Sequence, residues 1–279
     1  MDDRTAWMLL CRQLTLEFPD LIFWKHLARG LNGSGDIDAV APAAEALHVV
    51  RRMPELVKEN FPDAVLVFAC RHAANVHPIF VVSKRIFPRL AQFDVSFNPI
   101  RFGMPWCNPA DLVRFSVLDE HGIRVLRQGA LAVVLLMLYG INRDGRSSLK
   151  AHDWSDIALG WANDPEVAKQ FVQAVLPIAI QKPMRDVLES LGREDNGSKV
   201  RALWWACART AMFHHLCHGW KPLTAILRRR LANLCAVQTA VHHHDRVIQC
   251  EHIVSFIQKI QDSENVLFER KPEQFGNDL

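Results

Sequence analysis

Apolar residues near the start of the chain recur at intervals of three and four positions. This spacing is typical of the buried face of an amphipathic helix. It predicts a helix from Thr5 to Glu17, ended by the turn-forming sequence Phe18-Pro19-Asp20. The apolar positions are Trp7, Leu10, Cys11 and Leu14.

Short runs rich in β-branched and aromatic residues follow, separated by glycine, proline and asparagine, and such runs predict strands. The first two runs are joined by a Gly-rich turn, Gly30–Gly35. A helix over about residues 43–60 comes between the second and third runs. The expected strands cover residues 21–27, 36–40, 64–70, 78–83 and 92–97.

The second half of the chain loses the strand pattern and becomes helical. The change near residue 120 predicts an α+β protein, with a small mixed sheet and flanking helices in residues 1–120 and an α-helical bundle in residues 121–279. Expected helices cover residues 109–118, 125–140, 153–162, 165–176, 182–191, 199–218, 223–240 and 250–261.

Composition is that of an ordinary globular protein, with 49% hydrophobic and 23% charged residues. The longest apolar run, Gly129–Ile141, is shorter than the ~20 residues of a membrane span, so no membrane segment is expected. The N-terminus has no secretory pattern, which predicts a cytoplasmic protein. The seven cysteines are widely spaced without a CxxC pair, so reduced thiols are expected rather than a disulfide framework.

The formal net charge is only +3, but residues 196–244 contain no Asp or Glu. A basic surface of this kind favours phosphate groups, and RNA is one partner that it would suit. The alternative is that these cations lie on solvated helix faces and pair with acidic residues from elsewhere in the fold. The cations of the segment are Lys199, Arg201, Arg209, Lys221, Arg228, Arg229 and Arg230.

Two acids follow the Gly-rich turn, Asp36 and Asp38, with Ile37 between them. Because side chains alternate along a strand, both carboxylates are expected on one face while Ile37 points into the core. Carboxylates and substrate phosphates are the ligands that Mg²⁺ prefers in proteins. The pattern therefore indicates a divalent cation.

A third acid, Asp94, lies in the last predicted strand. Phe93, Val95 and Phe97 share one face of that strand, which leaves Asp94 on the other face with Gln92 and Ser96. An acid between core residues is costly unless it is paired or bound to a metal. Three such acids on one small sheet suit a two-metal site for phosphoryl or nucleotidyl transfer.

The order of a Gly-Ser turn, two strand acids, a helix and a third strand acid resembles the nucleotidyltransferase superfamily typified by DNA polymerase β and the kanamycin nucleotidyltransferase. The resemblance covers roughly residues 21–97. It implies that Asp36 and Asp38 bind two Mg²⁺ ions and an NTP, that Asp94 is a metal ligand and base, and that Gly33 and Ser34 touch the triphosphate. Only Gly35 separates Ser34 from Asp36 here, fewer residues than in many members, so the phosphate-contacting turn could instead be residues 30–32.

A second segment, residues 149–157, resembles the basic segment that opens the helical domain of divergent nucleotidyltransferases. The resemblance implies that Lys150 reaches the triphosphate. The alternative is that Asp153 or Asp156 caps a helix and Lys150 lies on the surface.

Other residues that could carry chemistry have simpler interpretations. His214 and His218 share a helical face, as expected of a polar face or, less directly, of a zinc site to which the histidines at 242–244 and 252 would add ligands. The aromatic residues of the same region are expected to pack between helices rather than to stack on bases. These residues are Trp204, Trp205, Phe213 and Trp220.

The sequence predicts a Mg²⁺-dependent nucleotidyltransferase that moves an NMP from an NTP onto an acceptor hydroxyl or phosphate. A small-molecule acceptor such as an antibiotic or sugar is favoured, and an RNA-modifying enzyme of the toxin type, acting on tRNA, is the alternative. A non-catalytic nucleotide- or RNA-binding module on the same fold and a structural protein that binds a partner also stay open. The resemblance further implies a homodimer.

Overall fold

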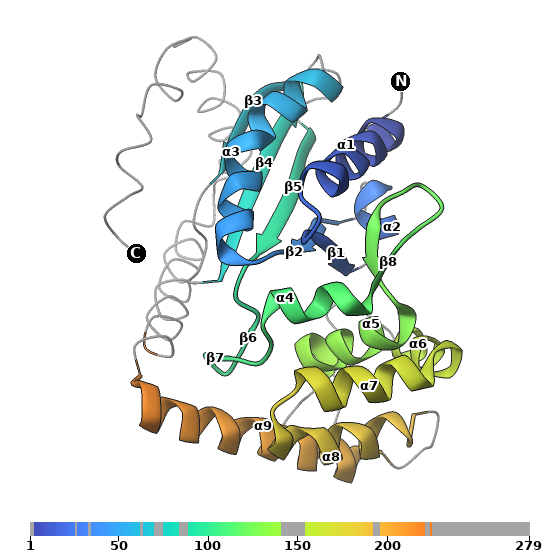
Figure 1. The fold of residues 1–279 in the computed structure, drawn as a ribbon, viewed down its shortest axis with the longest axis vertical. Helices are drawn as coiled ribbons and strands as arrows, with labels where there is room; N and C mark the ends of the chain where they lie inside the picture. The colour runs from blue at the N-terminus through green and yellow to red at the C-terminus, as the bar shows by residue number, and fades with distance from the viewer. Residues whose placement is uncertain are drawn as a thin grey trace, which may run out of the picture.

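The computed structural model describes residues 3–25, 27–32, 35–61, 64–69, 75–83, 89–140, 154–191, 196–220 and 224. Within them the chain forms a mixed sheet with helices on one face and a group of packed helices at one end (Figure 1). This arrangement confirms the α+β class expected from the sequence.

The main sheet has seven strands in the order β3-β4-β5-β2-β1-β9-β8. Its two parallel pairs are β2 with β5 and β1 with β9, and its other pairs are antiparallel. A separate two-stranded ribbon joins β6 to β7. The strands are β1 (Ile22–Lys25), β2 (Ile37–Val40), β3 (Ala64–Ala69), β4 (Val76–Ser83), β5 (Arg89–Ser96), β6 (Ile100–Arg101), β7 (Met104–Pro105), β8 (Ser116–Leu118) and β9 (Arg124–Leu126).

Most predicted helices are present, although residues 223, 225–240 and 250–261 lie outside the described part of the chain. The helix predicted over 182–191 begins and ends a few residues earlier, as α8. The helices are α1 (Asp3–Glu17), α2 (Leu27–Leu31), α3 (Ala43–Asn60), α4 (Pro109–Leu112), η1 (Val113–Phe115), α5 (Gln128–Leu135), η2 (Leu136–Gly140), α6 (Trp154–Asn163), α7 (Pro165–Val175), α8 (Ile178–Leu188) and α9 (Gly197–His218).

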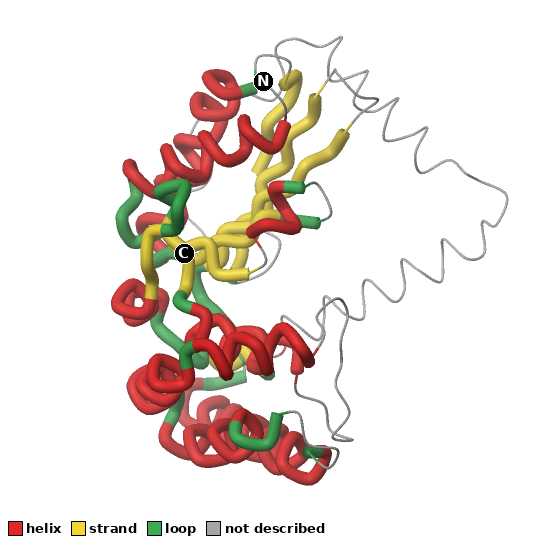
Figure 2. The backbone as a smooth tube through the Cα atoms, turned by 90° about the vertical axis from the view of Figure 1, so that its right-hand side faces the viewer, coloured by secondary structure: helices red, strands yellow, loops and turns green. Residues whose placement is uncertain are grey.

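Helices α1 and α3 lie side by side over one face of the sheet (Figure 2). Alternate strand residues enter the core between the helices and the sheet, among them the fully buried Phe93 and Val95 of β5 and the 2% exposed Ile37 of β2. Burying a side chain of this size stabilises the fold by roughly 1.5–3 kcal/mol. A one-residue slip of either strand would expose it, so the core fixes the register.

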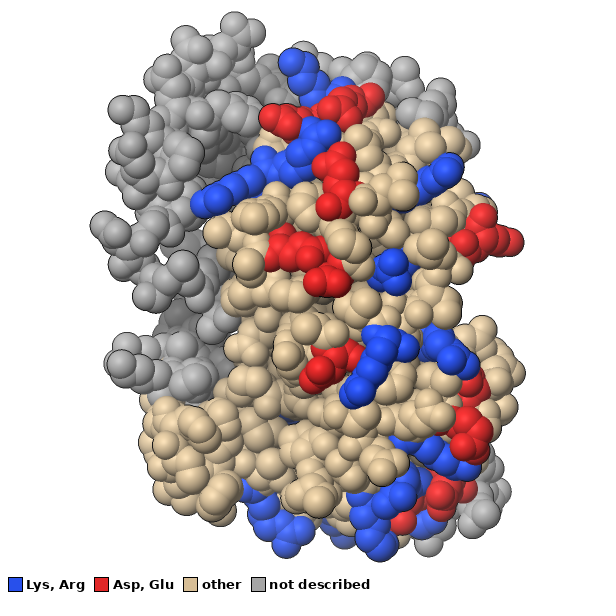
Figure 3. All heavy atoms as spheres, viewed as in Figure 1, with Lys and Arg blue, Asp and Glu red and all other residues tan. Residues whose placement is uncertain are grey.

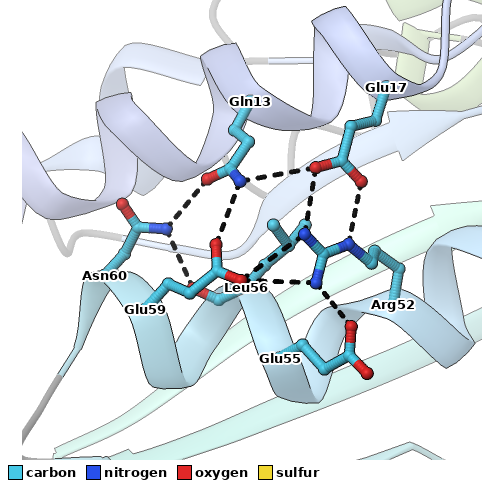
Figure 4. Close-up of polar contacts among 7 residues, drawn as sticks. All are labelled: Gln13, Glu17, Arg52, Glu55, Leu56, Glu59 and Asn60. Carbon is cyan, nitrogen blue, oxygen red and sulfur yellow. Dashed lines mark hydrogen bonds and ion pairs between the residues drawn. The ribbon is translucent and has the colours of Figure 1, made fainter.

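Polar contacts hold α1 against α3 on the outer side of this layer (Figure 4). Arg52 of α3 donates from Nε and Nη2 to the Glu17 carboxylate of α1, at 2.9 and 3.2 Å. Gln13 donates to Glu59 at 3.1 Å and accepts from Asn60 at 3.2 Å. The hydrogen bond from Arg52 holds the pKa of Glu17 below its ordinary value.

A second core joins the sheet to the helices at the lower end of Figure 1. Ile22, Trp24 and Val40 contribute to it from β1 and β2, on the face opposite to α1 and α3. Helix α5, buried along most of its length, packs against α6 and α7. The central strands therefore send alternate side chains into two cores.

The sequence analysis missed two strands at the edges of predicted helices: the helix predicted over 109–118 ends in β8, and the helix predicted over 125–140 is preceded by β9. The hairpin β8–β9 turns at Asp119, whose carboxylate accepts from the backbone N–H groups of His121 and Ile123 at 2.9 and 2.8 Å. Gly122 supplies the positive φ of 74° that the turn requires. Residue 120, where the sequence analysis placed the change from strands to helices, thus lies inside a hairpin whose second strand pairs with β1.

Among the described residues, none of the helices combines the length and the apolar character that crossing a bilayer demands. Cys11, Cys107 and Cys207 are buried free thiols, whereas Cys217 is an exposed one. For these cysteines the expectation of reduced thiols is confirmed; Cys70, Cys235 and Cys250 lie outside the described residues.

Candidate functional site

Asp38 and Asp94 are direct neighbours on parallel strands. In the register of β2 and β5, Asp38 pairs with Asp94, between the buried pairs Ile37–Phe93 and Ala39–Val95. Because side chains alternate along each strand, both carboxylates lie on the face opposite to α1 and α3, at half-buried positions. The predicted alternation of acid and core residues is confirmed for Asp38 and Asp94, whereas Asp36 precedes β2.

A lysine that the sequence analysis did not single out lies against this pair. The Lys25 Nζ of β1 is 2.6 Å from Asp38 Oδ1, and it donates to the hydroxyl of Tyr139 at 3.0 Å. Asp94 accepts a hydrogen bond from the Gln92 amide at 2.8 Å. The only sequence signal for Lys25 is its place at the end of a short apolar run.

Charge at the site is crowded. Burial raises the pKa of Asp38 to about 6, and the Asp94 and Asp36 carboxylates push it in the same direction, against the lowering effect of Lys25. Burial lowers the pKa of Lys25, but the Asp38 carboxylate and Tyr139 outweigh it, so that this pKa lies above its ordinary value. The ammonium group of Lys25 therefore offsets part of the negative charge around Asp38.

The other predicted site residues are placed less centrally or lie outside the described chain. Asp36 is exposed at the residue before β2. Its carboxylate is near enough to raise the pKa of Asp38. Gly33, Ser34 and Lys150 lie outside the described residues.

The Gly-rich turn predicted between β1 and β2 is wrong at its first two positions. Gly30 and Leu31 are buried in the short helix α2, which packs against β2. A Cβ on Gly30 would lie 2.7 Å from both the carbonyl oxygen of Asp36 and Cγ1 of Ile37. Gly30 therefore permits a close approach of α2 to the backbone that carries the acids.

We expect Gly30→Ala to lower the free energy of unfolding by about 1–3 kcal/mol, because the added methyl group meets backbone that cannot move freely. Alanine is otherwise the better helix former by ~1 kcal/mol. A loss of stability would therefore indicate the steric conflict, and a gain would indicate helix propensity alone. Urea unfolding measures the change. Gly35→Ala is the matched control, since a Cβ there has no neighbour within 4 Å; equal stabilities for the two variants would contradict the packing role.

The histidines and aromatic residues in and just after α9 are only partly as predicted. His214 and His218 stack with ring centroids 4.5 Å apart. Trp204 packs on the second core and meets Phe102 edge to face, as expected. The packing expectation is wrong for Phe213, which is 69% exposed. Trp205 and Trp220 are partly exposed, and they pack against the rings of Trp204 and His215.

Three of the seven cations of the basic segment, Lys199, Arg201 and Arg209, lie in α9 within the described chain. In the space-filling view, basic side chains gather along the edge formed by α8 and α9, with acidic ones among them (Figure 3). Lys221 and residues 228–230 lie outside the described residues.

The donor set at the sheet suits a hard cation. Mg²⁺ is commonly held by one or two carboxylates, with substrate phosphates and water as its other ligands. Asp38 and Asp94 offer two adjacent carboxylates, and their mutual repulsion is what a divalent charge relieves. Within the described ranges, no three or more His, Cys, Asp or Glu side chains are grouped so that they could hold a metal ion, and Asp36, Asp38 and Asp94 do not form such a group.

No protein-family model matches this chain, and no curated protein matches it. Among solved structures the chain is similar to the crystal structure of JHP933 from Helicobacter pylori, with 14% sequence identity, coverage of 83% of this chain and 94% of that chain, and a TM-score of 0.38.

Proposed function

We propose that this chain is a Mg²⁺-dependent nucleotidyltransferase that transfers an NMP from an NTP to an acceptor hydroxyl or phosphate and releases pyrophosphate. The observation that carries the proposal is the in-register pair of Asp38 and Asp94 on adjacent parallel strands. The nucleotidyltransferase resemblance also calls for two acids on an early strand and a third on a later neighbouring one. Asp36, Asp38 and Asp94 follow that order.

The three acids have distinct roles in this proposal. Asp36, Asp38 and Asp94 would hold two Mg²⁺ ions, with substrate oxygens as further ligands, and these ions would neutralise negative charge on the triphosphate. Asp94 accepts the proton of the acceptor hydroxyl, and the Gln92 amide, 2.8 Å from its Oδ1, fixes the orientation of that carboxylate. Gly33, Ser34 and Lys150 add contacts to the triphosphate.

A small molecule such as an antibiotic or a sugar is the proposed acceptor. An RNA acceptor would use the cations of residues 196–244, and its binding would weaken steeply with salt because each phosphate contact releases counterions. RNA binding that does not change with salt concentration would exclude that version.

Thermal unfolding with each of the four NTPs, with and without Mg²⁺, tests the proposal. A ligand present at about 100 times its Kd stabilises the native state by ~2.7 kcal/mol, which raises Tm by several degrees in a chain of this size. We expect such a rise for at least one NTP, only with Mg²⁺, and its loss in Asp38→Asn.

The matched control is Asp186→Asn, the same chemical change at an acid of α8 that is paired with Lys182 at 2.9 Å. It should respond to Mg²⁺ and nucleotide as the wild type does. A folded wild type that responds to none of the NTPs would overturn the proposal. A response without Mg²⁺ that survives in Asp38→Asn would instead indicate a non-catalytic nucleotide-binding module.

A further inference from the structure

A β-bulge decides which way Lys25 faces. Along β1 and β2, Ile22 pairs with Val40 and Phe23 with Ala39, after which the register shifts so that Lys25 pairs with Asp38. An uninterrupted register would set Trp24 opposite Asp38 and would turn Lys25 toward the core under α1 and α3. The extra residue therefore directs the ammonium group to the acids, a common use of bulges beside functional sites.

The surroundings of Lys25 hold its ammonium group in place. The side chains of Lys25 and Asp38 are only 13% and 15% exposed. Besides Asp38 Oδ1, Nζ contacts the Tyr139 hydroxyl at 3.0 Å and lies 5.7 Å from the Trp24 ring centroid. Lysine is almost never buried unless it is paired, and each of these neighbours suits a cation.

A structural ion pair between β1 and β2 is the simpler explanation for these contacts. Buried ion pairs contribute little net stability compared with well-packed apolar residues, and the strands already have buried side chains on both faces. Tyr139, moreover, belongs to η2 and not to the sheet. Lys25 thus has a second partner that remains when Asp38 binds something else.

We propose that Lys25 is a phosphate-binding residue of this site: its ammonium neutralises Asp38 while no metal is bound, and, retained by Tyr139, it turns to the nucleotide phosphates when a divalent cation takes Asp38. This inference rests on the proposed function. Lys25 keeps its proton throughout and exchanges one anionic partner for another. It competes with a metal alone and cooperates with a metal–nucleotide complex.

The proposal is tested by the opposite effects of Lys25 on the binding of a metal alone and of a metal–nucleotide complex. Binding of Mn²⁺ alone, and of the Mg²⁺ complex of the NTP that most stabilises the wild type, is measured by calorimetry on the full chain. In Lys25→Met we expect Mn²⁺ to bind about tenfold more tightly, because an adjacent positive charge is gone. The Mg²⁺–NTP complex should bind at least about tenfold more weakly, because a hydrogen-bonded charge to the phosphates is lost.

Lys169→Met is the matched control, since Lys169 is an exposed lysine of α7 paired with Glu166 at 2.7 Å. It removes the same charge far from the acids in the sequence and should leave both affinities within about twofold, as surface charges are largely screened. Lys25→Arg keeps the charge and should leave Mn²⁺ binding within the same range.

Failure of the inference is distinguishable from failure of the proposed function. If the wild type binds neither Mn²⁺ nor any Mg²⁺–NTP complex, both are wrong. If the wild type binds them and Lys25→Met changes the two affinities in the same direction, or neither, Lys25 is structural and the proposed function stands.

A second variant covers the case in which Lys25→Met does not fold. Tyr139→Phe keeps the ring and removes the hydroxyl that retains the ammonium group. We expect the Mg²⁺–NTP complex to bind about tenfold more weakly, since a hydrogen bond to a charged group is lost, with Mn²⁺ alone unchanged. Unchanged affinity for the complex in this variant overturns the proposal.

Discussion

Asp38→Asn should be more stable than the wild type at pH 7, by about 3 kcal/mol, when no ligand is present. Burial, with Asp94 and Asp36, raises the pKa of Asp38 from 3.8 to about 6, and each pH unit corresponds to 1.36 kcal/mol. A raised carboxyl pKa means that the folded chain holds the proton more tightly than the unfolded chain. This stabilisation is present below the unfolded pKa and is lost as pH rises to about 6. Asparagine resembles the protonated acid, so the Asn variant keeps this stabilisation at all pH values.

Urea unfolding of both proteins between pH 4 and pH 8 measures this difference. It should be below ~1 kcal/mol at pH 4 and should grow to its full value near pH 7. Asp186→Asn, at an exposed acid, should show no such growth. A less stable Asp38→Asn at pH 7 would show that the ion pair with Lys25 outweighs the crowding of the acids.

Under the proposed function, the same substitution should also slow the transfer reaction. Metal-assisted charge stabilisation contributes several kcal/mol to such reactions, so its loss should slow NMP transfer by at least about 100-fold. Asp94→Asn should have an effect of similar size, because it removes both the proposed metal ligand and the proposed base. A variant that gains stability and loses activity indicates a site in which like charges repel one another.

Gly129→Ala should destabilise the chain by at least about 3 kcal/mol. Gly129 is buried in α5 where α7 crosses it, and a Cβ there would overlap the carbonyl oxygen of Asp164 and lie 2.8 Å from the amide nitrogen of Ala168. Both atoms are backbone, so one helix must move away. Intrinsic helix propensity predicts the opposite sign, a gain of ~1 kcal/mol.

Gly160→Ala in α6 is the graded comparison. Its Cβ would meet the carbonyl oxygen of Gln128 at 2.9 Å and Cβ of Ala132 at 3.2 Å, a milder conflict that should cost less. Denaturant unfolding of the two variants, read at constant m-value, gives the order. An equal or larger loss at Gly160 would contradict the described crossing of α5 and α7.

The acids of the site could be found from the sequence, whereas their lysine could not. Asp38 and Asp94 each stand between apolar residues on a short strand, and alternation alone assigns their face. Lys25 reaches that face through a bulge, which depends on the pairing of β1 with β2 and leaves no mark in the local pattern. Tyr139 was inside an apolar run that indicated only a buried helix.

In the fold, too, elements determined by the local sequence could be predicted, whereas elements that depend on pairing with distant residues could not. Helix α3 has the bounds Ala43–Asn60 that were expected, since Pro42 precedes it and its apolar face repeats regularly. Strands β8 and β9 have three residues each, and they exist because β9 pairs with β1, about a hundred positions earlier. Three residues are too few to show the alternation that predicts a strand, so the helical patterns on either side decide the prediction.

The most direct measurement is the crystal structure of the full chain with Mn²⁺ and a non-hydrolysable NTP, with the metal located by its anomalous scattering. The proposed site requires an ion beside β2 and β5, bonded to carboxylate oxygens of both Asp38 and Asp94 at about 2.1 Å and to oxygens of the triphosphate. A nucleotide bound elsewhere, or an ion that touches neither acid, would contradict it.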